Sequence, residues 1–219
     1  MPRALFEKTG KAVYISHLDL MRLFQRAFKR AGLPLTHTQG FNPRPSVSIA
    51  LPLSLGVESV CELLDFDLEG EKISNEEILS RLNESLVEGV KVLSVYDDFK
   101  KLKHLALLDC VVTLEYDNGI PEGAKEQIEE LFAQAEVIVE KKGKNGPTEQ
   151  NIVPMIRTIS VNAVNSQELE LKALVCCQNP TLNPTQLSAA VSKYLPQLTP
   201  DFVRCRRLEI YDANEKIFR

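Results

Sequence analysis

The fold of the first half is set by an amphipathic helix in residues 16–34, which read SHLDLMRLFQRAFKRAGLP. Ser16 and Asp19 have the spacing at which a serine oxygen and an acid satisfy the free amide donors of a first helical turn. Apolar side chains recur every three or four residues and predict one buried face: Leu20, Leu23, Phe24, Ala27, Phe28 and Ala31. Gly32 predicts a left-handed cap, and Pro34 prevents the helix from continuing.

Strands are expected on both sides of this helix. Five segments of β-prone or alternating residues are predicted as strands: 4–7, 11–15, 46–51, 60–68 and 90–96. A second helix is predicted after Ser74, because Glu77 stands three residues further on and an apolar stripe follows. The first half therefore has the order β-α-β-β-α-β.

The second half repeats this order. Strands are predicted at 107–116, 136–140, 157–161, 169–175 and 204–211. One helix is expected from about Pro121, and another from Asn183 as its cap with Pro184 in its first turn. A loop rich in lysine and glycine is expected at residues 141–147.

The fold class expected from this repeated order is α+β, with two tandem ferredoxin-like (βαββαβ) halves. Each half has an antiparallel sheet with helices on one face. The expected domains are 1–98 and 104–219, and the alternative is one mixed α/β domain of another topology. Among the 219 residues, 44% are hydrophobic and 26% are charged, which is typical of globular proteins.

The location expected from the sequence is cytoplasmic. No apolar run approaches the ~20 residues of a membrane-spanning helix, and the first residues do not resemble a signal peptide. The five cysteines do not form a CxxC pair, and we expect buried thiols rather than disulfides: Cys61, Cys110, Cys176, Cys177 and Cys205.

The net charge of −4 hides an uneven distribution. Residues 1–44 carry eight Lys or Arg against two Asp or Glu, whereas residues 45–98 carry three against twelve. The predicted first helix holds half of these eight cations on its polar face, beside Asp19: Arg22, Arg26, Lys29 and Arg30. Such a row of cations is suited to phosphate oxygens, although a solvated helix face is the alternative interpretation.

A loop expected after this helix is the second candidate binding element. Gly40 and two prolines restrict the backbone of residues 36–45. Phe41 can stack on a base while its polar neighbours bond the edges of that base, as in the recognition of single-stranded RNA: Gln39, Asn42 and Arg44. The alternative is that Phe41 packs inside the turn.

The pattern of these segments resembles the radical SAM-linked protein family, a domain of unknown function. The resemblance rests on six stretches: YISHLDLMR at 14–22, RA at 26–27, AGLP at 31–34, QGFNP at 39–43, ALPL at 50–53 and GVES at 56–59. It implies a partner, because family members are fused to or encoded beside a radical SAM protein. One departure is Arg44, where the family usually has histidine, which weakens any metal or proton-transfer role at that position.

A polar site at His17, Asp19 and His37 is a further candidate, with Cys61 as an additional candidate metal ligand. The spacing of these residues does not indicate a ligand set, so we expect neither a metal nor a cofactor. The CxxxCxxC motif that holds a catalytic iron–sulfur cluster is absent from the sequence. The chain is therefore not expected to be a radical SAM enzyme itself, and we expect a non-catalytic role.

Three functions are compatible with the sequence. The leading hypothesis is an accessory protein that binds tRNA or rRNA for a radical SAM partner, with further contacts from the 141–147 loop and from Arg204, Arg206 and Arg207. The second is a metal-independent endoribonuclease of the CRISPR repeat-processing type, with His17 or His37 as acid or base. The third is a protein–protein adaptor whose acidic residues 58–88 meet a basic partner.

Overall fold

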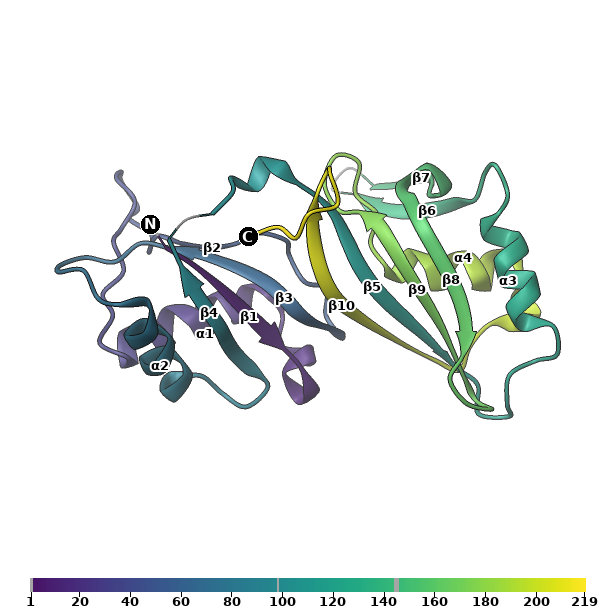
Figure 1. Ribbon diagram of the computed structural model, residues 1–219, viewed down its shortest axis with the longest axis horizontal. Coiled ribbons are helices and arrows are strands. Elements are labelled where there is room, and N and C mark those ends of the chain that lie inside the picture. Colours follow the sequence, from purple (N-terminus) through teal and green to yellow (C-terminus); the bar gives the residue numbers. More distant parts are fainter. Residues whose placement is uncertain (1, 98, 144–145) are drawn as a thin grey trace. The chain divides into compact units, whose positions relative to one another are not determined.

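The computed structural model describes residues 2–97, 99–143 and 146–219. The chain divides into two compact units. Unit 1 runs to Lys103 and also includes Arg219, and unit 2 comprises His104–Phe218. The described residues form a mixed α+β structure with four α-helices and mostly antiparallel strands (Figure 1). None of its helices is both long and apolar enough to cross a membrane.

Unit 1 has the predicted order of strands and helices. Its elements are β1 (Arg3–Lys8), α1 (His17–Arg30), β2 (Val47–Ile49), β3 (Val57–Phe66), α2 (Asn75–Ser85) and β4 (Val90–Tyr96). Strand β1 lies between β4 and β3, and β2 pairs with the other edge of β3. All of these pairs are antiparallel. In this strand order, neither helix connects two strands that are hydrogen-bonded to each other.

Both helices of unit 1 bury their apolar faces on the same side of its sheet. Phe24 of α1 meets Phe6 of β1 with ring centroids 4.8 Å apart, and Phe28 meets Phe66 of β3 at 4.9 Å. Ile78 and Leu82 bring α2 into the same core. Aromatic pairs at these distances add to the effect of burial, so the orientation of α1 about its own axis is fixed and its polar face remains outside.

The predicted helix starts of unit 1 are confirmed. The Ser16 hydroxyl accepts the amide of Asp19, and the Ser74 hydroxyl accepts the amide of Glu77. Gly32 follows α1 with φ +66, the left-handed conformation expected of a glycine cap.

The predicted strand at 11–15 is wrong, because Gly10–Tyr14 form a 3-10 helix. The segment buries the adjacent residues Ala12 and Val13, which a strand would point to opposite faces. The ammonium of Lys8 is fully buried and donates to the carbonyl oxygens of Val13 (3.1 Å) and Ile15 (2.8 Å). Because a buried cation must be paired, these carbonyl groups are held inward and the chain turns at this point.

Unit 2 has the same connectivity with one insertion. Its elements are β5 (Leu105–Glu115), α3 (Ala124–Phe132), β6 (Ile138–Gly143), β7 (Gly146–Asn151), β8 (Ile156–Ala163), β9 (Glu168–Cys176), α4 (Thr185–Tyr194) and β10 (Phe202–Asp212). The strand order is β10-β5-β9-β8, with antiparallel pairs throughout. Helices α3 and α4 lie on one side of this sheet (Figure 1).

The insertion corrects two predictions. Strand β6 does not join the main sheet but pairs with β7 as a separate hairpin. The loop expected at 141–147 is mostly strand, because Lys141 pairs with Thr148 and Lys142 with Pro147. Lys144 and Asn145 lie outside the described residues. The high content of lysine and glycine did not reveal these strands, because antiparallel pairing is made by backbone N–H and C=O groups.

Two helix boundaries in unit 2 also differ from the predictions. Helix α3 begins at Ala124, after Gly123 with φ +67, rather than near Pro121. Helix α4 begins at Thr185, one residue later than expected. The side-chain oxygen of Asn183 still accepts a hydrogen bond from the backbone amide of Thr185.

The prediction for the cysteines is confirmed, since all five are buried thiols. Burial raises the pKa of Cys205 to about 12, with a smaller opposing effect of Arg207. Tyr116 is likewise buried, which raises its pKa to about 12, and its hydroxyl donates to the carbonyl of Leu198.

A buried ion pair joins two neighbouring strands of unit 1. Arg3 has no exposed surface and faces Asp65 across the β1–β3 pair. Its guanidinium donates through Nε to Oδ1 and through Nη2 to Oδ2, the latter at 2.9 Å. Nη1 donates to the Lys100 carbonyl, and the Phe99 ring lies 4.1 Å from Cζ. Two-point contacts of this kind are the strongest arginine–carboxylate geometry.

Asp65→Asn is expected to destabilise unit 1 by about 3–5 kcal/mol, because the buried guanidinium would lose its counter-charge. Urea unfolding, monitored by hydrogen exchange of β1 and β3, measures this loss. Asp97→Asn is the matched control, since Asp97 is exposed and, within the described part of the chain, accepts from Asn75 alone. Equal stability of the two variants would show that the Arg3–Asp65 pair contributes nothing.

Candidate functional site

The structure divides the predicted cations of α1 between two hollows. Three of them, at spacings of four residues, line a hollow of about 400 Å³: Arg22, Arg26 and Arg30. Its other walls are Ile15, Asp19, Leu23 and Val87. Lys29 faces a different hollow on the adjacent edge of the helix. The prediction that all four form a single row is therefore corrected, because 3.6 residues per turn place position 29 on another edge.

The three arginines differ in how they are held. Arg22 donates to Asp19 at 2.9 Å, and Arg30 donates to the Ser85 carbonyl. Hydrogen bonds from the Ser16 hydroxyl and then from Arg22 hold the pKa of Asp19 below its ordinary value. Arg26 is exposed, and no ion pair or hydrogen bond holds its side chain among the residues described. Arg26 is thus the positive charge of this hollow that is most available to an anion.

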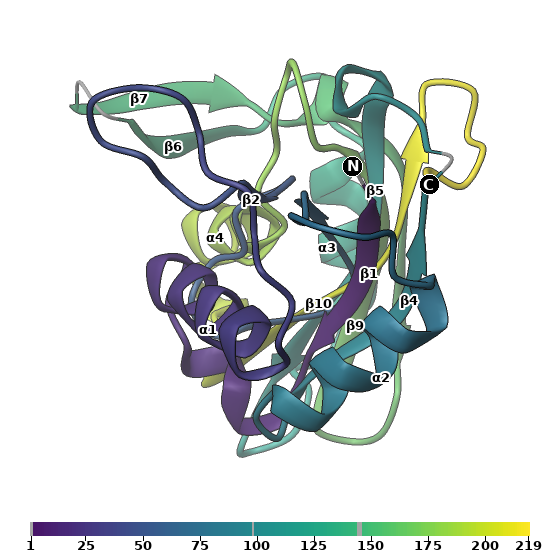
Figure 2. The ribbon, with the colours of Figure 1, turned by 90° about the vertical axis from the view of Figure 1, so that its left-hand side faces the viewer.

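The segment after α1 forms a narrow two-stranded loop. His37 and Pro45 form a β-bridge, and the Thr38 amide donates to the Arg44 carbonyl at 2.8 Å. The Arg44 amide returns a bond to the Thr38 hydroxyl at 3.0 Å. Figure 2 shows this segment, between α1 and β2, extending away from the helix. The backbone of the loop is therefore held at its base, and its tip projects outward.

The side chains predicted at the loop tip are all exposed: Gln39, Phe41, Asn42 and Arg44. Phe41 is 103% exposed, so it does not pack inside the turn. The apolar surface of a fully exposed aromatic ring is removed from water only when a binding partner covers the ring.

A second hollow in unit 1 was not predicted from the sequence. It has a volume of about 490 Å³ and is lined by the last turns of α1, the residues that follow it and one acid: Gln25, Phe28, Lys29, Gly32, Leu33, Pro34, Leu35, His37 and Glu69. His37 Nδ1 and Glu69 Oε1 are 3.8 Å apart. The spacing of Gln25 and Lys29 at i, i+4 could have predicted that both lie on one edge of the helix. No pattern in the sequence predicts that Glu69 lies beside them.

The polar residues His17, Asp19 and His37 do not form a common site. Among the residues described, no three His, Cys, Asp or Glu side chains are grouped as metal ligands. His17 lies at the start of α1, where its Nδ1 atom is buried and no described group bonds it. His37 lies instead in the second hollow, beside Glu69.

The arginines expected to extend a basic surface in unit 2 do not form a patch. Arg204 pairs with Glu115 at 3.0 Å and with Glu168 at 2.7 Å, which neutralises its charge. Arg207 is buried, whereas Arg206 is exposed, because successive side chains of β10 point to opposite faces.

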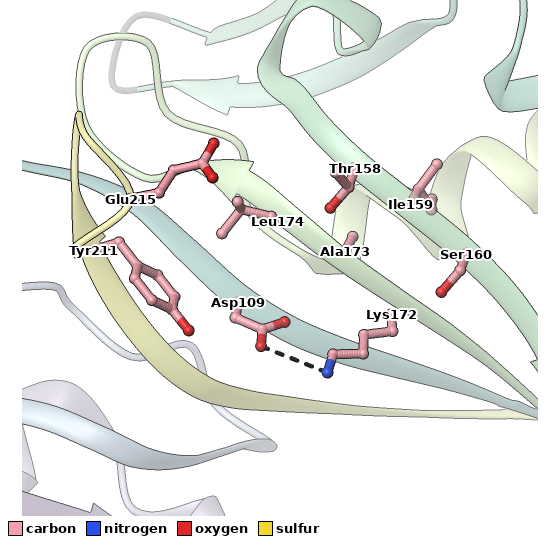
Figure 3. A pocket seen from close by; sticks show the side chains of 9 residues that line it. All are labelled: Asp109, Thr158, Ile159, Ser160, Lys172, Ala173, Leu174, Tyr211 and Glu215. Atoms are coloured by element: carbon pink, nitrogen blue, oxygen red, sulfur yellow. Dashed lines mark ion pairs between the residues drawn. The ribbon is translucent and has the colours of Figure 1, made fainter. Parts of the chain in front are cut away.

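Unit 2 has a hollow of its own on the sheet face away from its helices, with a volume of about 340 Å³ (Figure 3). Its side chains come from four strands and a turn: Asp109, Thr158, Ile159, Ser160, Lys172, Ala173, Leu174, Tyr211 and Glu215. Lys172 Nζ lies 3.8 Å from Asp109 Oδ2. Because Glu215 adds a second carboxylate, the charged groups here have a net negative charge, which makes this hollow unsuited to phosphate.

The pKa of Asp109 is raised from its ordinary value of 3.8 by burial, which outweighs the opposing effect of Lys172. Glu209 raises it further, and the amide of Cys110 lowers it. Since the folded protein favours the protonated carboxyl, this group stabilises unit 2 in acid. That contribution is lost as the pH rises above 3.8 and through the raised pKa.

Replacement of the cation is therefore expected to shift the titration of Asp109 in one direction. Lys172→Met removes a nearby positive charge, so the pKa of Asp109 should rise further. Carboxyl-carbon NMR titration of both proteins measures the shift. Lys125→Met is the control, because Lys125 pairs with Glu129 on α3 instead. An unchanged or lower pKa in Lys172→Met would contradict the assigned cause.

The family of this chain is given by a match of residues 2–184 to the family described as "Uncharacterized protein conserved in bacteria (DUF2344)". The chain belongs to this family. This match confirms the expected family of unknown function. The description of DUF2344 does not mention radical SAM proteins, so the link to them stays a prediction. A search of curated proteins found no match.

Two solved structures are similar to this DUF2344 protein at low sequence identity. A chain of the "Crystal Structure of a Cbf5-Nop10-Gar1 Complex" has 10% identity and a TM-score of 0.49, covering 95% of this chain and 48% of that one. The present chain thus spans about half the length of that chain. An unknown protein from Galdieria sulphuraria has 13% identity and a TM-score of 0.26, with coverages of 94% and 95%. Neither similarity supports an argument about function.

Proposed function

We propose that this DUF2344 protein is an RNA-binding accessory protein and that unit 1 holds its RNA-binding surface. The observation that carries the proposal is the row of Arg22, Arg26 and Arg30 along one hollow, with Arg26 uncommitted among the described residues. Arginine bonds phosphate oxygens in a forked geometry, and clustered cations release counterions from nucleic acid.

The exposed loop tip supports RNA rather than a small phosphate as the ligand. Phe41 offers a ring on which a base can stack, and the amides of Gln39 and Asn42 can bond base edges. His37, at the base of this loop, lines the same hollow as Lys29 of α1. Lys29 of the helix and His37 of the loop thus border one hollow, and a strand of RNA that passes it would meet the cations and the aromatic ring in the proposed arrangement.

A radical SAM protein is the proposed partner of this activity, and tRNA or rRNA is the proposed target. The support for the partner is the resemblance of residues 14–59 to the radical SAM-linked family. The chemistry would belong to that partner, since this sequence contains no CxxxCxxC motif.

We further infer that each unit is a variant of the ferredoxin-like fold. In both units the first strand lies between the third and fourth of the main sheet, and the second lies outside the third. The β6–β7 hairpin is then an insertion in the second copy. This inference is supported by connectivity, and it is consistent with RNA binding without requiring it.

The first test is binding of tRNA and rRNA fragments by the double variant Arg22→Glu/Arg26→Glu. Affinity should fall by at least tenfold and its dependence on salt should weaken, because two phosphate contacts are lost. Fluorescence anisotropy across a salt series measures both quantities. Lys125→Glu/Lys216→Glu changes the net charge equally in unit 2 and should retain wild-type affinity.

No binding by the wild-type protein even at low salt would overturn the proposal and favour the adaptor hypothesis. Cleavage of the RNA that is lost in His37→Ala would instead favour the endoribonuclease hypothesis.

The second test concerns the loop tip. Phe41→Ala should weaken RNA binding by about 1–3 kcal/mol, the usual contribution of one stacked base, without affecting stability. The same anisotropy assay and a thermal melt measure the two effects. Phe202→Ala is a control in unit 2, where the ring is 55% exposed. Full affinity in Phe41→Ala would remove this ring from the binding surface.

A further inference from the structure

The second hollow of unit 1 has the form of a small-molecule site. Its floor is apolar and well buried, since Phe28, Leu33 and Leu35 are exposed by 0%, 1% and 7%. Its volume of about 490 Å³ lies within the ~300–1,000 Å³ typical of ligand pockets. Gly32 borders it, and no atom lies within 4 Å of the position that a Cβ would occupy there. The hollow is therefore open to a flat, apolar group.

Two polar side chains of α1 line this hollow and have no described hydrogen-bond or ion-pair partner. Gln25 and Lys29 are one turn apart, and no described hydrogen bond or ion pair occupies the amide or the ammonium. The amide can both donate and accept, and the ammonium only donates. A ligand that satisfies both has a flat body with a mixed hydrogen-bonding edge and carries a negative group nearby.

The third polar element is a weak pair at the edge of the hollow. His37 Nδ1 lies 3.8 Å from Glu69 Oε1, which is too long for a hydrogen bond, and both side chains are more than half exposed, at 52% and 58%. The carboxylate of Glu69 is thus available to accept a donor from a ligand. An exposed pair of this kind contributes little to stability, so its rearrangement has a small cost.

We propose that this hollow binds one unstacked nucleobase of the bound RNA, with Gln25 and Glu69 on the base edge and Lys29 on the adjoining phosphate. The proposal rests on the proposed function and names a specificity site for it. The apolar floor takes the face of the base, as in other pockets for splayed-out bases. Arg26 and Lys29 belong to adjacent edges of one helix, so consecutive phosphates can reach both.

The proposal includes a preference among bases. Glu69 offers only acceptors, so it favours a base with an exocyclic amino group over uracil, which donates only through N3–H and has carbonyl oxygens that repel a carboxylate. A site built to bond an amino group discriminates against a base with a carbonyl oxygen in its place, because two acceptors then face each other.

The test uses the intact protein with four probes: AMP, CMP, UMP and ribose 5-phosphate. Two-dimensional NMR should show AMP or CMP shifting the Gln25 side-chain amide and the backbone amides of residues 29–37. UMP should bind more weakly by roughly tenfold, the equivalent of one lost hydrogen bond to a charged group. Ribose 5-phosphate should shift only signals near the cations.

Gln25→Glu should abolish the base-dependent shifts, because it replaces the amide donor with a negative charge beside the phosphate. Gln25→Leu, of similar size, should abolish them too and leave the response to ribose 5-phosphate unchanged. Gln127→Glu is the control, since Gln127 lies on α3 and bonds Gln197. Identical shifts from all four probes, or full base-dependent shifts in both Gln25 variants, would overturn the proposal.

The two proposals fail separately. If RNA binds and depends on Arg22 and Arg26 but no base-dependent shift appears at Gln25, the nucleobase site is wrong and the RNA-binding surface stands. If neither RNA nor any nucleotide binds, the proposed function itself fails.

Discussion

The buried ammonium of Lys8 determines where α1 begins, and the candidate site depends on that helix. Strand β1 ends at Lys8, whose Nζ donates to the carbonyl oxygens of Val13 and Ile15. Because the cost of an unpaired buried charge is several kcal/mol, the chain between these residues is constrained to turn back on the end of its own strand. Helix α1 then starts two residues after Ile15, with Ser16 as its cap.

Helix α1 has a structural face and a proposed binding face, and the first positions the second. Its aromatic contacts with Phe6 and Phe66 fix its rotation about its own axis. The same rotation directs Arg22, Arg26 and Arg30 to one edge and Gln25 and Lys29 to the next. A rigid element of this kind holds binding groups with less loss of side-chain freedom than a mobile loop does.

Local patterns in the sequence predicted the helix starts and the buried face of α1. The features that were missed depend on contacts between residues far apart in the chain. The caps at Ser16 and Ser74 and the apolar stripe of α1 were predicted correctly, because they depend on neighbours within one or two helical turns. The 3-10 turn was missed because it depends on a buried lysine, which composition alone assigns to the surface. Glu69 was missed because a pairing with His37 across 32 positions leaves no local trace. The pairing of Arg204 with two glutamates was missed for the same reason.

Comparison of the first helices of the two units assigns the proposed phosphate binding to α1 and not to the shared connectivity. Helix α3 follows the first strand of unit 2 as α1 follows that of unit 1, yet it carries Glu126, Glu129 and Glu130 with a single cation, Lys125. Three carboxylates there would repel a phosphate backbone, and the Debye length of about 8 Å at physiological salt confines such effects to the local surface. The chain can therefore have a net charge of −4 and still present a basic surface in unit 1. In the proposed function, acidic residues elsewhere would limit nonspecific adsorption of nucleic acid.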